Sequence, residues 1–254
     1  MKRIFLLLLM AFSMATYAQK TDLSTVNTVK PKSGQKMAFE AAYKTHVAKF
    51  HKAGDNVNVY EILSGAYAGY YHLVEGGKSY ADFDKERPDG SAHRLDLDKT
   101  FFPLLENTMN ATYRYVDSLS LRGDVVADKF VVTVRHLNSS LDFNEYRKEL
   151  ARGANVNKNQ KGGFWENLSY GVWEQLWDGS DQVTVSIRSL KDGFKSLETD
   201  YYGATPAGTP SFRDLYSKTY GNTAWDDRVK LMDKAVDKTE VYLMKHRPDL
   251  STPK

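Results

Sequence analysis

Four polar side chains on strand-like stretches could carry out chemistry together. His72 is the best candidate for proton transfer, because an unperturbed histidine titrates near neutral pH. Alternation in 70–74 places Tyr70 on the same face as His72, with residues 71 and 73 packed on the other face. Arg135 and Arg188 lie on the polar faces of two later stretches and could hold a carboxylate or another anion. If the strands enclose a cavity, these four residues are predicted to line it, although a slip of one residue would reverse the faces. The alternatives are a hydrogen-bonded histidine and arginines in cross-strand ion pairs.

Three tryptophans extend this hypothesis to aromatic ligands. Trp173 lies on an expected strand, with Trp165 and Trp177 on or beside the same hairpin. Together they could form a stacking wall for a ligand, or they could be ordinary packing residues. The predicted ligand-binding set is therefore Tyr70, His72, Arg135, Trp173 and Arg188.

Haem would need an axial ligand. Three of the six histidines lie on expected strands, and the sequence selects none of them: His72, His136 and His246. We therefore predict no cofactor, with haem kept as an alternative.

Metal and phosphate motifs are absent from the sequence. It contains no His-x-x-x-His or His-Glu-x-x-His pattern, and no cysteine. His46 and His51 are five residues apart on an expected helix, so they do not share a face and are predicted at its surface or flank. The stretch "EGGKS" (75–79) lacks the glycine that a phosphate loop requires four residues before its Gly-Lys-Ser. We predict no metal site.

Hydrophobic periodicity indicates which elements position these residues. A helix is predicted over 36–53 from an apolar stripe at spacings of four, four and three. "EGG" is expected to end the strand that carries His72, and Ser79 to cap a helix after it. Residues 87–96 resemble a loop, and 97–110 a helix. The remaining expected elements are strands at 57–63, 67–75, 111–121, 129–137, 164–178, 182–190 and 239–246, and helices at 139–158, 191–202, 212–221 and 224–236.

A similarity between two stretches of the sequence indicates that the chain contains two copies of one module. "YYHLVEGGKSYADFD" (70–84) matches "TVSIRSLKDGFKSLE" (184–198) at an offset of 114 residues. Either these are unrelated stretches with common devices, or each half has the order strand, helix, strand, strand, helix, strand, which is the ferredoxin-like order. In the first half, only "LSTVNTV" within 19–35 could supply the opening strand, and a flexible lead is the alternative. The predicted modules are 36–124 and 125–254.

Two such modules in one chain resemble the dimeric α+β-barrel superfamily, which includes antibiotic-biosynthesis-monooxygenase-like proteins. The resemblance implies an α+β fold in which two ferredoxin-like modules pack sheet to sheet around a central cavity. It also implies a wide range of functions: cofactor-free oxygenation, isomerisation, haem binding and degradation, or plain ligand binding. None of the catalytic residues of these families can be matched to the sequence.

The first residues predict export. "MKR" and the apolar run "IFLLLLMAFSMA" precede a small-residue cleavage site after Ala18, which is the pattern of a signal peptide over 1–18. Cleavage removes Lys2 and Arg3 and lowers the formal net charge from +3 to +1, so nucleic acid is a poor partner. After cleavage we expect a soluble periplasmic or secreted protein without a membrane span.

Three functions remain open from the sequence. The preferred hypothesis is an exported protein that binds a small molecule between two sheets. The second is an enzyme of the same superfamily, cofactor-free or haem-dependent, that uses His72. The third is a cell-envelope interaction protein whose 16 tyrosines form an interface.

Overall fold

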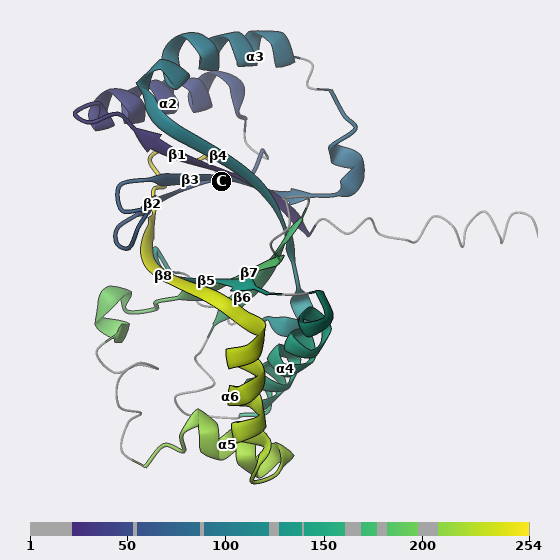
Figure 1. The fold of residues 1–254 in the computed structure, drawn as a ribbon. Coiled ribbons are helices and arrows are strands. Elements are labelled where there is room, and N and C mark those ends of the chain that lie inside the picture. The colour runs from purple at the N-terminus through teal and green to yellow at the C-terminus, as the bar shows by residue number, and fades with distance from the viewer. Residues whose placement is uncertain are drawn as a thin grey trace, which may run out of the picture.

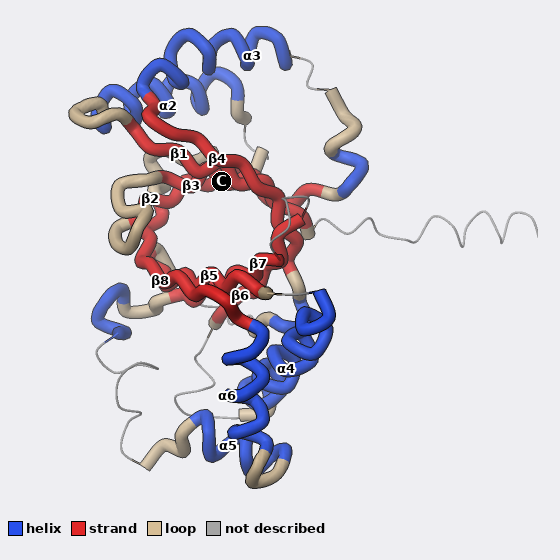
Figure 2. The backbone as a smooth tube through the Cα atoms, viewed as in Figure 1, coloured by secondary structure: helices blue, strands red, loops and turns tan. Residues whose placement is uncertain are grey.

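Eight antiparallel strands form a closed barrel. The computed structural model describes residues 22–52, 55–86, 89–121, 127–138, 140–160, 169–176, 182–197 and 208–253. Around the barrel the strands follow the order β1-β3-β2-β8-β5-β7-β6-β4. Figure 2 shows this ring almost end-on, with helices only on its outside. The strands are β1 (Leu23–Pro31), β2 (Val57–Ile62), β3 (Tyr71–Lys78), β4 (Leu105–Tyr115), β5 (Lys129–Leu137), β6 (Tyr170–Leu176), β7 (Gln182–Ser189) and β8 (Val236–His246).

Helices cover the barrel on two opposite sides (Figure 1). One side carries α2 (Lys36–Phe50) and α3 (Gly90–Asp96), and the other carries α4 (Ser140–Lys158), α5 (Phe212–Tyr220) and α6 (Ala224–Ala235). Short helical turns connect the main elements at Tyr80–Asp82, Leu97–Phe101, Phe102–Leu104, Asp117–Leu119 and Gly193–Leu197. None of the helices that the structure describes is long and apolar enough to cross a membrane.

Each half of the barrel has the ferredoxin-like strand order. The first half runs β4-β1-β3-β2 and the second runs β8-β5-β7-β6, so the chain order within each sheet is the same. The halves join through β2 with β8 and through β4 with β6. This confirms the predicted fold class, an α+β barrel of two ferredoxin-like modules in one chain. The predicted module boundary at 124/125 lies outside the described residues.

The opening strand of the first half is β1. The sequence left a flexible lead or an edge strand open here, but β1 pairs with β3 on one side and β4 on the other. It is a central strand of its half, and its side chains at Leu23 and Val29 are buried. Both neighbours belong to the same half, so the order of strands within that sheet makes β1 central, which local alternation could not reveal.

Three local predictions in the first half are wrong. The glycines of "EGG" do not end the strand, because β3 continues to Lys78. Register with β1 shifts there, so Gly76 and Gly77 form a bulge, and Gly77 adopts a positive φ of 73° that glycine tolerates. The predicted loop at 87–96 contains α3. The predicted helix at 97–110 ends at Leu104, because the polar stretch that follows pairs with β1 as part of β4.

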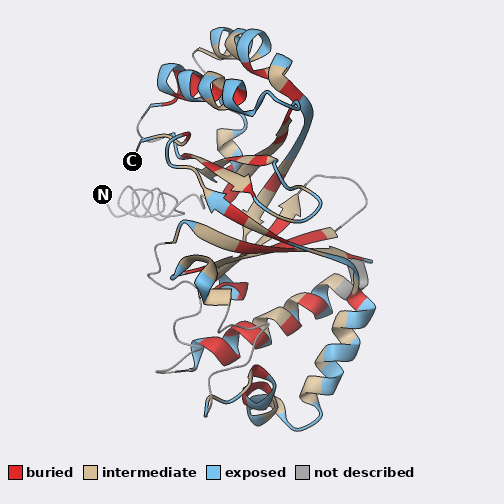
Figure 3. Ribbon diagram, turned by 90° about the vertical axis from the view of Figure 1, so that its left-hand side faces the viewer, coloured by how far each residue is buried: buried red, intermediate tan, exposed pale blue. Residues whose placement is uncertain are grey.

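The apolar core lies in separate layers. On the outer face of the first half's sheet, α2 buries Phe39, Tyr43 and Val47 against Tyr71 and Leu73 of β3. This is the predicted apolar stripe of the helix, and burial of each such side chain stabilises the fold by roughly 1.5–3 kcal/mol. Figure 3 shows buried residues along the helix faces that meet the barrel. A second cluster fills part of the barrel interior, and it includes Ile62 and Met244.

Candidate functional site

The barrel interior contains a cavity of about 730 Å³. All eight strands contribute to its wall, which is mostly aromatic and aliphatic. Its aromatic lining consists of Tyr60, His72, Tyr113, Tyr115, Phe130, Tyr170, Trp173 and Tyr242. A smaller cavity of about 370 Å³ shares four of its lining residues, namely His72, Tyr113, Val134 and Tyr242. The interior therefore consists of two chambers that meet at these four side chains.

His72 lies at this junction within a short hydrogen-bonded chain. Its Nδ1 is 2.8 Å from the hydroxyl of Thr28 on β1, and its Nε2 is 3.0 Å from the hydroxyl of Tyr242 on β8. Burial lowers the pKa of His72 to about 4, so the ring is neutral at pH 7. Burial also raises the pKa of Tyr242 well above its usual range, which keeps the phenol protonated. The junction thus presents uncharged donors and acceptors.

Trp173 covers part of the wall because of a glycine two residues before it. A Cβ on Gly171 would lie 2.3 Å from the indole ring of Trp173, so only glycine lets the ring fold back along its own strand. Tyr115 of β4 meets the same indole edge-on, with ring centroids 5.3 Å apart. These neighbours hold the indole as a fixed aromatic surface.

Acidic and amide groups supply the charge and polarity of the larger cavity. Asp22, Asp117, Asn56 and Asn58 belong to its lining. No lysine or arginine does so among the residues that the structure describes. An anionic ligand would therefore meet carboxylates without a compensating cation.

The five predicted ligand-binding residues separate into two groups. His72 and Trp173 lie on the cavity wall. Tyr70 precedes β3 and lines neither cavity; it packs in the interior aromatic cluster, edge-on to Tyr67 with ring centroids 5.5 Å apart. Arg135 and Arg188 line neither cavity. Whether the first three bind a ligand stays a prediction.

The face assignment for Arg135 and Arg188 is wrong. On β7, the apolar residues that alternate with Arg188, namely Val183, Val185 and Ile187, line the barrel interior. The opposite face, which includes both arginines, turns outward. There Arg135 donates to Ser186 at 3.3 Å.

The error has a physical reason. Apolar side chains were assigned to the helix-covered face because that face is usually the core. In this half, α4 meets β7 and part of β6 through polar groups: the hydroxyls of Tyr146 and Thr184 are 3.0 Å apart, and Arg147 pairs with Glu174 at 2.8 Å. Its apolar side chains pack instead near Leu137 at the end of β5 and Val172 of β6. In the first half, where α2 packs with apolar side chains, the predicted faces of Tyr71, His72 and Leu73 are correct.

Haem does not fit the larger cavity. The candidate ligand there, His72, has both ring nitrogens within hydrogen-bonding distance of hydroxyl groups, so iron would have to displace one of them. The described lining also offers no cation for the two propionates. The other candidates are His136, which lines the smaller cavity with its Nε2 3.6 Å from Glu240, and His246, whose Nε2 is 3.2 Å from the Ser251 hydroxyl.

The sequence did not indicate most of the residues in the cavity wall, nor the cluster formed by His46, His51 and His93. Tyr60, Tyr113 and Tyr242 were not selected, although each lies on a strand with alternating polarity. His46 and His51 were predicted at the surface, but they are buried, with exposed fractions of 1% and 8%. His51 follows the last turn of α2 in an extended conformation, so helical spacing does not apply to it. Trp165 and Trp177 lie outside the described residues.

The closed ring of two ferredoxin-like halves is the architecture of the dimeric α+β barrels. No family model and no curated protein matches the sequence. A solved structure of a protein provisionally named a monooxygenase, from Lactobacillus acidophilus NCFM, is similar with a TM-score of 0.52 at 7% identity, covering 88% of this chain and 93% of that chain. An anthrone oxidase-like protein gives 0.50 at 13% identity, covering 92% and 97%. A variant chlorite dismutase from Candidatus Nitrospira defluvii gives 0.50 at 8% identity, covering 90% and 93%.

At these identities the similarity concerns the fold alone. The chain therefore has the fold of the dimeric α+β barrels, with both modules in a single chain, as the resemblance implied.

Proposed function

We propose that this protein binds a small, planar, uncharged or cationic aromatic molecule inside the barrel. One observation carries the proposal: a cavity of about 730 Å³ has aromatic walls, polar groups that are neutral or acidic, and no lysine or arginine in its described lining. Its volume lies within the usual range of small-molecule sites, which are mostly apolar with a few oriented polar groups. The predicted anion site at the arginines is abandoned, because those side chains line neither cavity.

The polar groups at the chamber junction supply specificity in this proposal. A hydroxyl or carbonyl group of the ligand would replace one partner of the His72 ring, either Thr28 or Tyr242. The rings of Tyr115 and Trp173 would contact the ligand's faces or edges. A ligand without a hydrogen-bonding group would leave the junction unchanged and gain only apolar contact.

A cofactor-free enzyme is the second candidate. With a pKa of about 4, the ring of His72 is a weak base, so it would take a proton only from an acidic substrate such as an activated carbon acid. Tyr242 can donate a hydrogen bond to the oxygen that becomes negative. The names of the structures with this fold, which include an anthrone oxidase-like protein, add support. A variant His72→Gln that keeps ligand affinity and loses turnover would favour catalysis over plain binding.

Export is part of the proposal and rests on the sequence. Cleavage after Ala18 would leave Gln19 as the first residue, three residues before the start of the described structure. Mass spectrometry of the protein recovered from the periplasm or medium of an expressing cell tests this. A chain that keeps residues 1–18 would contradict it.

The binding proposal is tested with two matched substitutions. Val185→Phe adds bulk to the cavity wall, whereas Val241→Phe adds the same bulk at a position on β8 that is 47% exposed. Native mass spectrometry and a panel of two- and three-ring phenols, ketones and carboxylates provide the readout. We expect binding of neutral members, loss of at least tenfold in affinity for Val185→Phe, and none for Val241→Phe. Preference for the carboxylates, or equal loss in both variants, would refute the proposal.

A further inference from the structure

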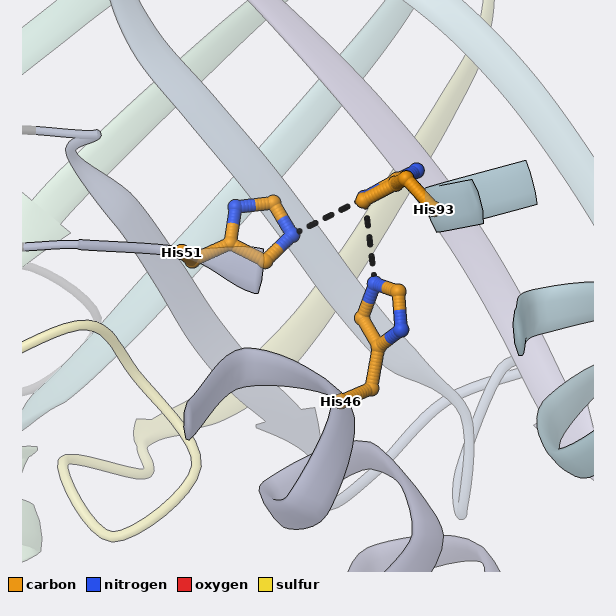
Figure 4. A group of neighbouring side chains, drawn as sticks. All are labelled: His46, His51 and His93. Carbon is orange, nitrogen blue, oxygen red and sulfur yellow. Dashed lines mark hydrogen bonds between the residues drawn. The ribbon is translucent and has the colours of Figure 1, made fainter. Parts of the chain in front are cut away.

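Three histidines meet outside the barrel, between the helices of the first half (Figure 4). His46 lies on α2, His51 directly follows α2, and His93 lies on α3. The Nε2 of His93 is 3.1 Å from the Nε2 of His46 and 3.2 Å from the Nε2 of His51. One ring nitrogen from each residue lies within 4.8 Å of the other two. None of the three lines either cavity of the barrel.

Carboxylates lie at the far side of two of these rings. The Nδ1 of His46 is 2.8 Å from a carboxylate oxygen of Asp96, and the other oxygen of Asp96 accepts a hydrogen bond from Lys49 at 3.0 Å. Because an ionised carboxylate only accepts, the Nδ1 of His46 carries the proton and its Nε2 exposes a lone pair when the ring is neutral. The Nδ1 of His51 is 3.6 Å from a carboxylate oxygen of Asp55, which is longer than a hydrogen bond.

Three ring nitrogens that face one another suit a positive centre. The Nε2 of His93 can carry at most one hydrogen, yet it faces two other ring nitrogens. A single proton satisfies one of the two contacts, or both only weakly. A metal cation bound by all three nitrogens would satisfy every lone pair at once.

The distances suit such an ion. Imidazole nitrogens bind Zn²⁺ at about 2.0–2.1 Å in tetrahedral geometry, which places ligand nitrogens roughly 3.3 Å apart. The two separations from His93, 3.1 and 3.2 Å, lie close to that value, and the third pair of nitrogens lies within 4.8 Å. Carboxylates that accept from the second ring nitrogen are the usual outer partners of metal-bound histidines.

We propose that His46, His51 and His93 form a binding site for a divalent transition-metal ion, with Zn²⁺ the ion that the ligand set fits best. Three neutral imidazoles leave the fourth tetrahedral position for water or an external ligand. His93 retains partial exposure, which gives the ion a path to solvent, while Phe50 packs against the rings of His46 and His93. The ion would join α3 to the end of α2, because the ligands come from both elements.

Metal titration of the whole mature chain, without an affinity tag, tests the proposal. After treatment with a chelator, the protein is titrated with Zn²⁺ by calorimetry and with Co²⁺ by visible absorption, where a tetrahedral site gives intense d–d bands. We expect one equivalent per chain and an increase in Tm on adding Zn²⁺. His93→Asn should abolish stoichiometric binding. Asp96→Asn should weaken binding by roughly 10–100-fold, because it removes the outer partner of His46.

His246→Asn is the matched control, since His246 lies at the end of β8 beside Ser251 and should leave binding unchanged. His51→Asn serves as a second variant, and circular dichroism of each metal-free protein shows whether it is folded. A wild-type chain that takes up no ion at micromolar Zn²⁺ would show a hydrogen-bonded histidine cluster only, and would overturn the proposal. Equal binding by folded His93→Asn or His51→Asn protein would overturn it as well.

Discussion

Acid should destabilise this protein through His72. Burial lowers the pKa of His72 in the folded state to about 4, whereas the same side chain in an unfolded chain titrates near 6.5. Between these values the unfolded state binds more protons than the folded state. The stability that the neutral ring contributes is therefore complete above about pH 6.5 and is lost as the pH falls through about 4.

The size of this effect follows from the shift. A difference of about 2.5 pKa units corresponds to about 3 kcal/mol at roughly 1.4 kcal/mol per unit. Water in the cavity beside His72 would screen the charge and reduce this figure. For a chain of this size, 1 kcal/mol changes Tm by about 2–4 °C, so the full effect is a decrease of about 6–12 °C.

Urea denaturation of the wild type and of His72→Gln between about pH 7 and pH 4 isolates the effect. Glutamine does not titrate, and its amide can hydrogen-bond to the hydroxyls of Thr28 and Tyr242. Other carboxylates and histidines titrate equally in both proteins and cancel in the difference. We expect the free energy of unfolding of the wild type to fall about 3 kcal/mol further than that of the variant. Parallel pH profiles, or a His72 ring that titrates near pH 6.5 by NMR, would refute the reasoning.

Two further substitutions test the cavity wall and the ion pair between Arg247, which directly follows β8, and Glu40 of α2. Gly171→Ala should displace the indole of Trp173, since the new Cβ would lie 2.3 Å from it; overpacking of this kind costs roughly 1–3 kcal/mol, measurable by urea denaturation, and ligand affinity should fall with it. A variant with wild-type stability and affinity would contradict that geometry. Arg247→Ala should cost about 2 kcal/mol, between the values for exposed and buried pairs, because Arg247 forms a two-pronged ion pair with Glu40 at 2.7 and 2.9 Å. A decrease in Tm of less than about 1–2 °C would instead show that this ion pair stabilises the fold no more than an exposed ion pair does.

Strong periodicity made most of the elements predictable. "KFVVTVRHL" is β5 at the residues expected, and the helix over 139–158 differs from α4 by one residue at its start. These segments have one dominant period and clear ends, so local propensity and tertiary structure agree. Residues 105–110 lack that agreement: their polar side chains resemble the surface of a helix, but pairing with β1 makes them a strand.

The candidate site was predictable only in part, for a related reason. Alternation shows that His72 and Leu73 lie on opposite faces of a strand, and the aromatic content indicates what could line a pocket. Alternation does not show which face turns inward. Where the helix contact is apolar, the assumption that apolar faces meet helices gave the right answer. On β5 and β7 it failed, because the outward face carries polar groups such as Arg135, Thr184 and Ser186, whereas the apolar face turns into the barrel.

The sequence by itself determined the element order and the two-module plan, because these depend on periodicity within short segments. Only the tertiary structure decided the barrel closure, the inward face of each strand and the histidine cluster. Closure pairs β2 with β8 and β4 with β6 across separations of more than fifty residues, and His93 reaches His46 across 47 positions. Such contacts depend on the path of the whole chain, and no local pattern of residues encodes them.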